Sequence, residues 1–358
     1  MKNIDMTLDL CWGSCGKGGI SGYLAKRGDY DTVTCAYGTQ AGHSYNDKEA
    51  GIKMMVQQLP VGIISPTVKN VLIGPGALIH ADVLMQEIDR YLPHLEGKRI
   101  MIHEHAAVVT DEHSKAEYAI GQTKMGSTAK GVGQAAIERI LRNPDNPNVA
   151  RHRFKGTPLE QFVTSRYEYA AAMHGAKSIL VEGAQGFGLS MYHGEYPYVT
   201  SRDVTPWQLA ADCALPFEWS GRINAFGVTR TYPIRVNNRD GSSGPAYPGQ
   251  RELTWGEIGV EPELTTVTKL PRRVFEFSSE QLQHAAEYCL GPDSSVVLTF
   301  ADYLATYEEL CTMIDKIIAA TGCRVSMVCF GPDDSDIVDL RNKPMGASYH
   351  QLFGKYCK

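Results

Sequence analysis

Short apolar segments alternate with amphipathic stretches along nearly the whole chain, and this alternation limits the possible folds more than any other feature. The first unit runs from an apolar stretch at residues 4–12 through a glycine-rich turn into a predicted helix at residues 18–26. Further strand and helix candidates follow in turn at residues 32–37, 70–73, 81–92, 99–103, 133–142, 159–174, 178–182, 225–236, 279–289, 295–299, 307–320 and 324–329, with 81–92, 133–142 and 159–174 among the helices. Such a pattern predicts an α/β fold, a mostly parallel central sheet flanked by helices.

Two stretches between these elements are predicted to be long loops. Residues 143–156 are rich in Asn and Pro, and residues 237–271 hold many Gly, Pro and Thr with little helical or strand periodicity. Long loops inside a compact domain are commonly functional. We interpret the second stretch as a loop that closes over a substrate.

Composition narrows the classes of function. The 358 residues carry 35 Lys and Arg against 40 Asp and Glu, a formal net charge of −5, which argues against a strongly basic nucleic-acid binder. No run approaches the ~20 apolar residues of a membrane span, and the N-terminus lacks the pattern of a secretory signal, so we expect a cytoplasmic protein. The nine scattered cysteines are expected to be reduced thiols, mostly in the core, and their spacing does not favour a zinc site.

The sharpest local motif is the turn Gly13-Ser14-Cys15-Gly16-Lys17-Gly18-Gly19, between a strand and a helix. Glycines let backbone N–H groups approach phosphate, the helix N-terminus favours negative charge, and a lysine supplies a point charge. The motif departs from P-loop spacing, because Cys11 stands where the first glycine would fall and Gly18 where Ser or Thr would follow the lysine. A phosphate cradle and a plain tight turn both fit this stretch.

Three further glycine-rich segments follow strands or precede helices. They are Gly38-Thr39-Gln40-Ala41-Gly42-His43-Ser44, residues 121–133 with Gly126-Ser127-Thr128 at their centre, and Glu182-Gly183-Ala184-Gln185-Gly186, which leads to residues 193–201. Ligands of open α/β sheets lie outside the carboxyl ends of the strands, so several such turns at one edge are a stronger signal than any one of them.

Taken in order, these blocks resemble the adenylosuccinate synthetases over nearly the whole chain. The matching segments are residues 12–19, 38–44, 126–128, 182–186 and 193–201, and the likeness extends to residues 227–236, 265–273 and 298–302. The resemblance implies a single domain over residues 1–358, with a P-loop-NTPase-like adenylosuccinate synthetase fold and long substrate loops. It also implies a Mg²⁺-dependent ligase that phosphorylates the 6-oxygen of a purine monophosphate and then displaces the phosphate with the aspartate amine.

The resemblance also assigns roles to residues of this chain. Ser14, Lys17, His43 and Gln185 are expected to be catalytic, and Ser14 and the Gly42 carbonyl to hold Mg²⁺. The phosphoryl donor is expected to contact Ser14, Gly16, Lys17, Gly18, Gly42, His43, Ser44, Asp302 and Gly331. The substrate nucleotide is expected to contact Ser14, Gln40, Ser127, Thr128, Arg142, Gln185, Thr200 and Leu270. Aspartate is expected to contact Thr268 and Arg272. Arg142 matches a family residue that reaches the phosphate of the neighbouring subunit, which implies a homodimer.

One departure from the family pattern changes the expected substrate. Where the family has Asp-Glu after Trp-Gly, this chain has Ser14-Cys15. The family aspartate is the general base for N1 of the purine and a Mg²⁺ ligand, and an unactivated hydroxyl is not such a base. The aspartate-to-serine change resembles the virus-encoded branch of the family, the 2-aminoadenylosuccinate synthases, which use dGMP. A short Ser14 side chain leaves room for the 2-amino group of guanine and accepts a hydrogen bond.

Two further departures bear on the sugar and the donor. Leu270 stands where the family has an arginine near the ribose, and an apolar residue suits 2′-deoxyribose, although a one-residue slip would give that role to Lys269. The guanine-reading Lys-x-Asp of the family is Phe300-Ala301-Asp302 here, which favours ATP or dATP as donor.

We therefore predict a ligase that joins L-aspartate to C6 of dGMP. The alternatives are an ordinary adenylosuccinate synthetase that takes IMP and GTP, and an inactive nucleotide-binding regulator. The base for N1 is left unassigned.

Overall fold

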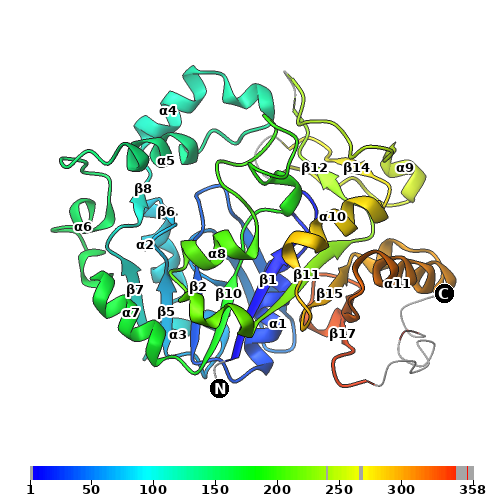
Figure 1. Cartoon of the computed structure of the whole chain (residues 1–358), viewed down its shortest axis with the longest axis horizontal. Helices are drawn as coiled ribbons and strands as arrows, with labels where there is room; N and C mark the ends of the chain where they lie inside the picture. The colour runs from blue at the N-terminus through cyan, green and yellow to red at the C-terminus, as the bar shows by residue number, and fades with distance from the viewer. Residues whose placement is uncertain (1–2, 239–240, 266–268, 344–352, 354–358) are drawn as a thin grey trace.

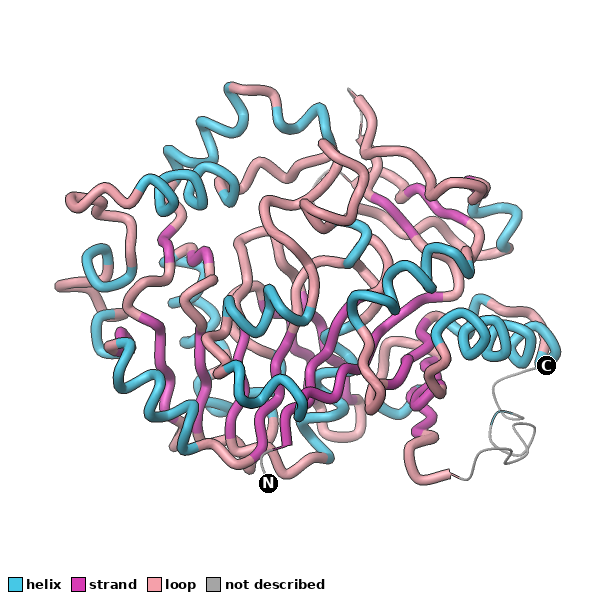
Figure 2. The backbone as a smooth tube through the Cα atoms, in the orientation of Figure 1, coloured by secondary structure: helices cyan, strands magenta, loops and turns pink. Residues whose placement is uncertain are grey.

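A ten-stranded sheet forms the centre of the computed structural model, which describes residues 3–238, 241–265, 269–343 and 353 (Figures 1 and 2). In spatial order the strands are β17 (Ile337–Asp339), β16 (Val325–Cys329), β15 (Ser295–Thr299), β11 (Ile223–Arg230), β1 (Asn3–Asp9), β10 (Ser178–Glu182), β2 (Thr32–Cys35), β5 (Asn70–Ile73), β7 (Arg99–His103) and β9 (Val163–Thr164). Each pairing is parallel except that of β17 with β16. The predicted α/β fold is confirmed.

Helices cover both faces of this sheet, as Figure 1 shows. Side chains of successive strand residues point to opposite faces, so β2 and β5 send Val33 and Val71 to one core while Leu72 packs in the other. The first core is closed by α1 (Lys17–Arg27), the 3₁₀ helix η1 (Val61–Ile64), α2 (Ala81–Arg90), α3 (Leu92–Leu95) and α6 (Ala150–Arg153). The second is closed by α7 (Arg166–Gly175), α8 (Pro206–Asp212), α10 (Ser279–Cys289) and α11 (Tyr307–Thr321).

Smaller units are attached around the central sheet. They are the hairpin of β3 (His43–Asp47) and β4 (Ile52–Val56), the pair β6 (Leu78–Ile79) and β8 (Ala107–Val108), the helices α4 (Asp111–Ala119) and α5 (Val132–Leu141), and the antiparallel sheet of β12 (Ile234–Arg235), β14 (Arg273–Phe275) and β13 (Glu252–Leu253) with α9 (Trp255–Ile258). Single 3₁₀ turns lie at η2 (Gln122–Met125), η3 (Glu160–Phe162), η4 (Phe187–Leu189), η5 (Phe217–Arg222), η6 (Ala301–Tyr303) and η7 (Asp334–Asp336).

Four predicted elements differ from the structure. The loop predicted at residues 143–156 contains the short helix α6. The helix predicted at residues 159–174 begins only at Arg166, because Ser165 and Glu168 form a capping box and the preceding Val163–Thr164 pairs with β7. The segment at residues 225–236 divides into β11 and β12, which belong to different sheets. The stretch at residues 237–271, predicted to have little regular structure, contributes β13 and α9, where Thr254 and Glu257 form a second capping box.

Parallel strands bring their carboxyl ends to one edge of the sheet, and the predicted motifs follow those ends. The glycine-rich turns come directly after β1, β2 and β10, and Phe300 and Phe330 come after β15 and β16. These segments therefore meet although they lie far apart in the sequence. Among the described residues, no helix is both long and apolar enough to span a membrane.

Candidate functional site

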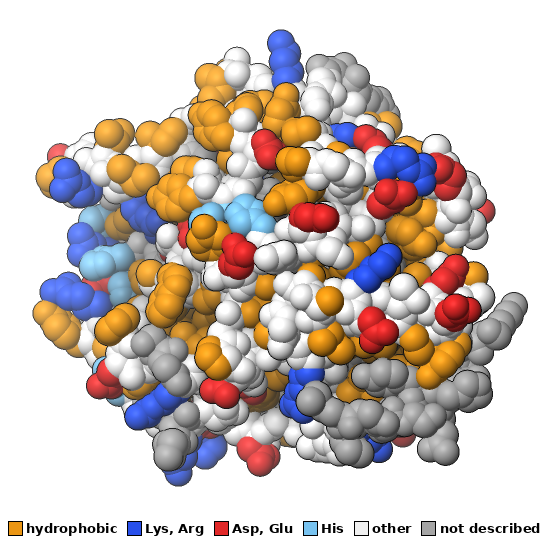
Figure 3. Space-filling model, turned by 45° about the vertical axis from the view of Figure 1, so that its right-hand side comes forward, with side chains coloured by type: hydrophobic (Ala, Val, Ile, Leu, Met, Phe, Trp, Pro, Cys, Tyr) orange, Lys and Arg blue, Asp and Glu red, His pale blue; other side chains and the backbone are white. Residues whose placement is uncertain are grey.

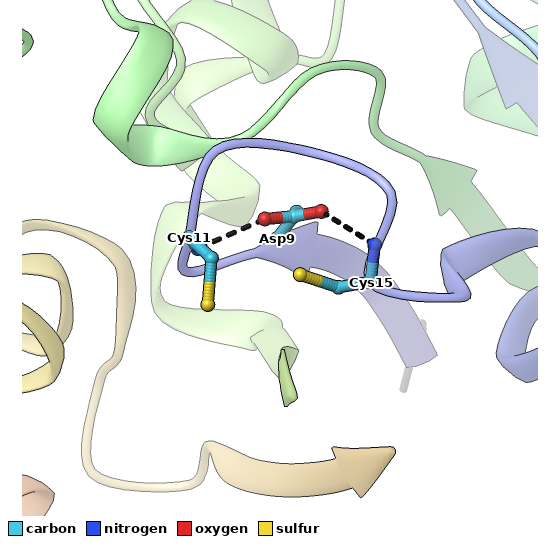
Figure 4. A group of neighbouring side chains, drawn as sticks. All are labelled: Asp9, Cys11 and Cys15. Carbon is cyan, nitrogen blue, oxygen red and sulfur yellow. Dashed lines mark hydrogen bonds between the residues drawn. The ribbon is translucent and has the colours of Figure 1, made fainter. Parts of the chain in front are cut away.

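Asp9, the last residue of β1, fixes the shape of the first glycine-rich turn. Its Oδ1 accepts hydrogen bonds from the backbone N–H of Cys11 at 2.9 Å and of Gly13 at 3.3 Å, and its Oδ2 accepts from the N–H of Cys15 at 3.3 Å. Figure 4 shows the carboxylate inside the turn, between the two cysteines. Oδ2 also accepts from Nζ of Lys17 at 3.0 Å, a pair in which both side chains are buried. One carboxylate therefore holds the turn closed from within.

The outer side of the same turn is open. Ser14 and Gly16 are exposed, and both have a left-handed backbone, with φ of 56° and 81°. For a residue with a side chain, that conformation costs roughly 1–2 kcal/mol. Two contacts support it: Nη1 of Arg230 donates to the Ser14 carbonyl at 3.0 Å, and the hydroxyl of Thr299 donates to the Cys15 carbonyl at 2.9 Å. The apex of the turn is thus preformed and faces outward.

The side chains of Asp9, Cys11 and Cys15 form a buried cluster of possible metal-binding atoms, all within 4.8 Å of one another. The Asp9 oxygens are engaged by three N–H groups and Lys17, so this carboxylate acts as the anchor of the turn. The hydrogen bond from Cys15 lowers the pKa of Cys11, and burial raises the pKa of Cys15. All eight cysteines among the described residues are free thiols, and six are buried, as expected for core residues.

The start of α1 packs directly against β3, which brings Lys17 close to His43. A Cβ added to Gly18 would lie 2.7 Å from the backbone N and O of Ser44, so this contact requires glycine. His43 is buried, and burial, together with the charge of Lys17, lowers its pKa to about 3. Its ring is therefore neutral near pH 7, with one N–H donor and one acceptor.

A buried chain of polar groups continues from His43 to β10. The Tyr37 ring stacks on the His43 ring with centroids 4.4 Å apart, and its hydroxyl lies 3.4 Å from His43 Nδ1. The same hydroxyl donates to Glu182 at 2.8 Å. The backbone N–H groups of Val61 and Gly62 also donate to Glu182, but burial raises its pKa to about 7. The orientation of the His43 ring is thus set by its neighbours.

The turn after β10 packs on the first turn and lines an adjacent cleft. A Cβ on Gly186 would lie 2.3 Å from the Gly13 nitrogen, so the two turns touch through their backbones. Gln185 has a left-handed backbone, with φ of 66°. With Gln40 it lines a narrow cleft beside Arg202 and Asp203. The buried Oε1 of Gln40 has no hydrogen-bond partner, although its Nε2 donates to Thr200 at 3.4 Å. A ligand donor would satisfy that oxygen.

The remaining predicted residues lie around this centre. Gly42 and Ser44 are exposed beside His43, and Ser127 and Thr128 are exposed between η2 and α5. Arg142 is exposed at the end of α5. Asp302 and Gly331 follow the adjacent strands β15 and β16, and burial raises the pKa of Asp302. Leu270 and Arg272 lie on one arm of a hairpin, while Thr268 lies outside the described residues.

Sequence reasoning missed five residues of this centre: Asp9, Tyr37, Arg230, Glu182 as a hydrogen-bonding group, and Glu263, which pairs with Arg230. A carboxylate at the end of a strand, directly before a glycine-rich turn, was a signal for Asp9. The others make contacts between residues far apart in the sequence, which no local pattern indicates.

Comparisons with known proteins identify relatives over the full length. The sequence model of the family described as Adenylosuccinate synthetase matches residues 7–146 and 149–315. The chain is 39% identical over 389 residues to the N6-succino-2-amino-2'-deoxyadenylate synthase of Acinetobacter phage SH-Ab 15497, covering 100% of this chain and 99% of the relative. It is 41% identical over 354 residues to the protein of the same name from Vibrio phage phiVC8, covering 96% and 100%.

Two solved structures resemble the fold. The Cyanophage S-2L succinoaminodeoxyadenylate synthetase bound to dGMP and dATP as an energy donor has a TM-score of 0.90 at 36% identity, covering 99% of both chains. The fully ligated adenylosuccinate synthetase of Plasmodium falciparum has a TM-score of 0.74 at 19% identity, covering 94% of this chain and 99% of the other, and shares the fold.

Proposed function

The chain belongs to the adenylosuccinate synthetase family and is a carbon–nitrogen ligase of that type, and on this premise we propose that it joins L-aspartate to C6 of dGMP with dATP as phosphoryl donor. The observation that carries the proposal is the full-length likeness to the phage synthases, one of which is described as bound to dGMP and dATP. The product would be 2-amino-2′-deoxyadenylosuccinate, and the reaction would take place in the cytoplasm of an infected host.

The proposal explains why a serine occupies the apex of the first turn. Ser14 is exposed and held by the Arg230 contact, so its hydroxyl is available to a ligand. Guanine differs from hypoxanthine by a 2-amino donor beside N1. A hydroxyl is smaller than a carboxylate and accepts from that donor, so the 2-amino group is accommodated. We assign no side chain as the base for N1.

The first turn and its neighbours would bind the triphosphate. Gly16, Gly18 and the N-terminus of α1 present backbone N–H groups to anionic oxygens, and Lys17 adds a positive charge. The exposed Ser44 hydroxyl and, beyond β15 and β16, Asp302 and Gly331 would contact the rest of the donor. The exposed Ser14 hydroxyl and Gly42 carbonyl are neutral oxygen ligands. They fit a Mg²⁺ ion held mainly by substrate phosphates, which would neutralise charge during phosphoryl transfer.

His43, Gln40 and Gln185 would position the purine. Because His43 is neutral, its N–H can donate to the 6-oxygen as negative charge develops there. The Gln40 oxygen needs a donor, and guanine offers N–H groups of that kind. The hydroxyls of Ser127, Thr128 and Thr200 would hold the 5′-phosphate.

The paired segments at residues 263–265 and 270–272, with the residues between them, would supply the aspartate and deoxyribose contacts. Arg272 presents a guanidinium whose fork matches a carboxylate, and Thr268 would assist it. Leu270 has no polar group to offer a 2′-hydroxyl, so a deoxyribose leaves no buried donor unpaired there.

We further propose a homodimer formed through α4 and α5. These helices expose Tyr118, Ile120, Ile137, Ile140 and Leu141, whose relative exposure ranges from 51% to 71%. Figure 3 shows apolar side chains gathered on the upper part of the molecule, where these helices lie in Figure 1. Large apolar side chains exposed together on neighbouring helices favour a protein partner. Arg142 ends α5 beside this surface, so it would reach the neighbouring active site.

A substrate panel tests the proposed function. The purified protein is incubated with Mg²⁺ and aspartate, with dGMP or IMP as acceptor and dATP, ATP or GTP as donor, and products are identified by mass. We expect the aspartate adduct of dGMP, formed fastest with dATP. Product from IMP alone would instead establish an ordinary adenylosuccinate synthetase, and nucleotide binding without phosphate release in any mixture would establish an inactive regulator.

A further inference from the structure

Arg230 is a fully buried cation next to the proposed site with no direct role in the chemistry described above. It ends β11 and has 0% exposure. Its guanidinium carbon lies 3.7 Å from the centroid of the Phe300 ring, and its Nη1 donates to the Ser14 carbonyl at 3.0 Å. Since a buried guanidinium is stable only with partners, these contacts fix where Arg230 can lie.

Glu263 supplies the counter-charge to Arg230. One Glu263 oxygen pairs with Nη2, and the other lies 3.4 Å from Nη1. The Tyr303 hydroxyl also donates to this carboxylate, at 3.1 Å. Glu263 therefore contacts Arg230 of β11 and Tyr303 of η6. Arg230 in turn contacts both Glu263 and Ser14.

Glu263 is also the first residue of the hairpin that carries Leu270 and Arg272. The Glu263 carbonyl accepts a hydrogen bond from the Arg272 N–H at 2.7 Å, and the adjacent residues Leu264 and Pro271 form an antiparallel β-bridge. Thr265 and Leu270 exchange two further hydrogen bonds, at 2.8 and 3.0 Å. A displacement of Glu263 is thus transmitted to both proposed substrate contacts on the opposite arm.

We infer that Arg230 and Glu263 form a positioning pair that couples the turn at Ser14 to the paired segments at residues 263–265 and 270–272. The inference rests on the proposed function, because it assumes that the turn binds nucleotide and the hairpin binds aspartate. Arg230 lies between the two segments and contacts both, so each segment's conformation depends on the other. By thermodynamic linkage, each of the two ligands, aspartate and nucleotide, then raises the affinity of the protein for the other. Loss of the Arg230–Glu263 pair lowers both affinities.

The test uses full-length Glu263→Gln, Arg230→Lys and the double variant. Glu263→Gln keeps the shape of the side chain but removes the charge that pairs with the buried Arg230, while Glu263 itself is partly exposed. Breaking a hydrogen-bonded charge pair with one buried partner weakens function by roughly tenfold. We expect the aspartate KM to rise about tenfold and, in titrations without aspartate, the dATP Kd to rise at least about threefold. The double variant should be about as impaired as either single variant, because the two residues act as one unit.

Glu252→Gln is the matched control, since Glu252 pairs with Arg273 on the neighbouring β14 but does not contact Ser14. It should leave the dATP Kd unchanged, and thermal melting of all variants checks that they fold. The inference is overturned if Glu263→Gln leaves the dATP Kd within twofold of the wild type, or if the two single effects multiply. Failure of the proposed function would appear separately, as a wild-type protein that makes no product from dGMP; the binding titrations would still report the coupling.

Discussion

The contact between α1 and β3 can be tested with two adjacent glycines. A Cβ at Gly18 would meet the Ser44 backbone at 2.7 Å and the His43 Cβ at 3.0 Å, whereas a Cβ at Gly19 has no neighbour within 4 Å. Both residues lie in the first turn of α1, so replacement by alanine brings each a similar gain in helix propensity, roughly 0.5–1 kcal/mol. The difference between the two variants therefore isolates the steric cost at Gly18.

Overpacking against atoms that cannot move aside costs about 1–3 kcal/mol, so Gly18→Ala should be less stable than Gly19→Ala by that amount. In a chain of 358 residues the difference corresponds to roughly 1–4 °C in Tm, or ~1.3 °C per kcal/mol. Since relief of the clash moves β3, and His43 begins β3, kcat for dGMP should also fall in Gly18→Ala but not in Gly19→Ala. Equal melting temperatures and equal kcat values in the two variants would refute the close packing of α1 on β3.

Three other measurements address the sugar, the dimer and a buried acid. Leu270→Arg should shift the ratio of kcat/KM from dGMP towards GMP by roughly tenfold, because a donor is restored for the 2′-hydroxyl; an unchanged ratio would contradict the ribose assignment. Ile140→Asp, at a side chain that is 69% exposed, should give a monomer in sedimentation velocity, and a persisting dimer would place the interface elsewhere. Burial raises the pKa of Glu182 from 4.5 to about 7, so between these values the folded protein retains a proton that the unfolded chain releases. The free energy of unfolding should therefore fall by about 3 kcal/mol relative to Glu182→Gln as the pH rises from 4.5 to 7. If the unfolding free energies of wild type and Glu182→Gln change with pH in parallel, Glu182 does not titrate in this way.

The sequence predicts the central strands of this fold because strands buried on both faces consist of short runs of apolar residues. Residues 70–73, 178–182 and 295–299 are short apolar runs, as expected for strands covered on both faces, and each is a strand of the same bounds in the structure. The predicted start of α7 at residue 159 is too early, because residues 159–164 are compatible with a helix in the absence of the pairing between β9 and β7. Pairing is a tertiary effect, which propensity does not contain.

In the candidate site, too, local motifs predict some residues, while long-range contacts determine others. Glycine-rich turns at strand ends locate Lys17, His43 and Gln185, because parallel strands bring such turns together whatever the details of the fold. The residue pairs that position these side chains cannot be predicted from the sequence. The Arg230–Glu263 pair spans 33 residues of the chain, and the Tyr37–Glu182 pair spans 145. Neither pair leaves a periodic or spacing signal, and their roles depend on which strands are neighbours.

Under the proposed function, the arrangement around Asp9 would let the first turn bind phosphate without a carboxylate at its apex. A triphosphate bound at this turn would draw Lys17 away from Asp9, and separating this buried pair would leave the carboxylate without its cation. Asp9 still accepts from the N–H groups of Cys11, Gly13 and Cys15, so the turn keeps its shape when Lys17 moves. Ser14 and Cys15 stand where the resemblance places two acids, so no carboxylate at the apex would oppose a bound phosphate. In the proposed function, Ser14 also stands where the resemblance places the base for N1, so the turn would bind anions without supplying that base.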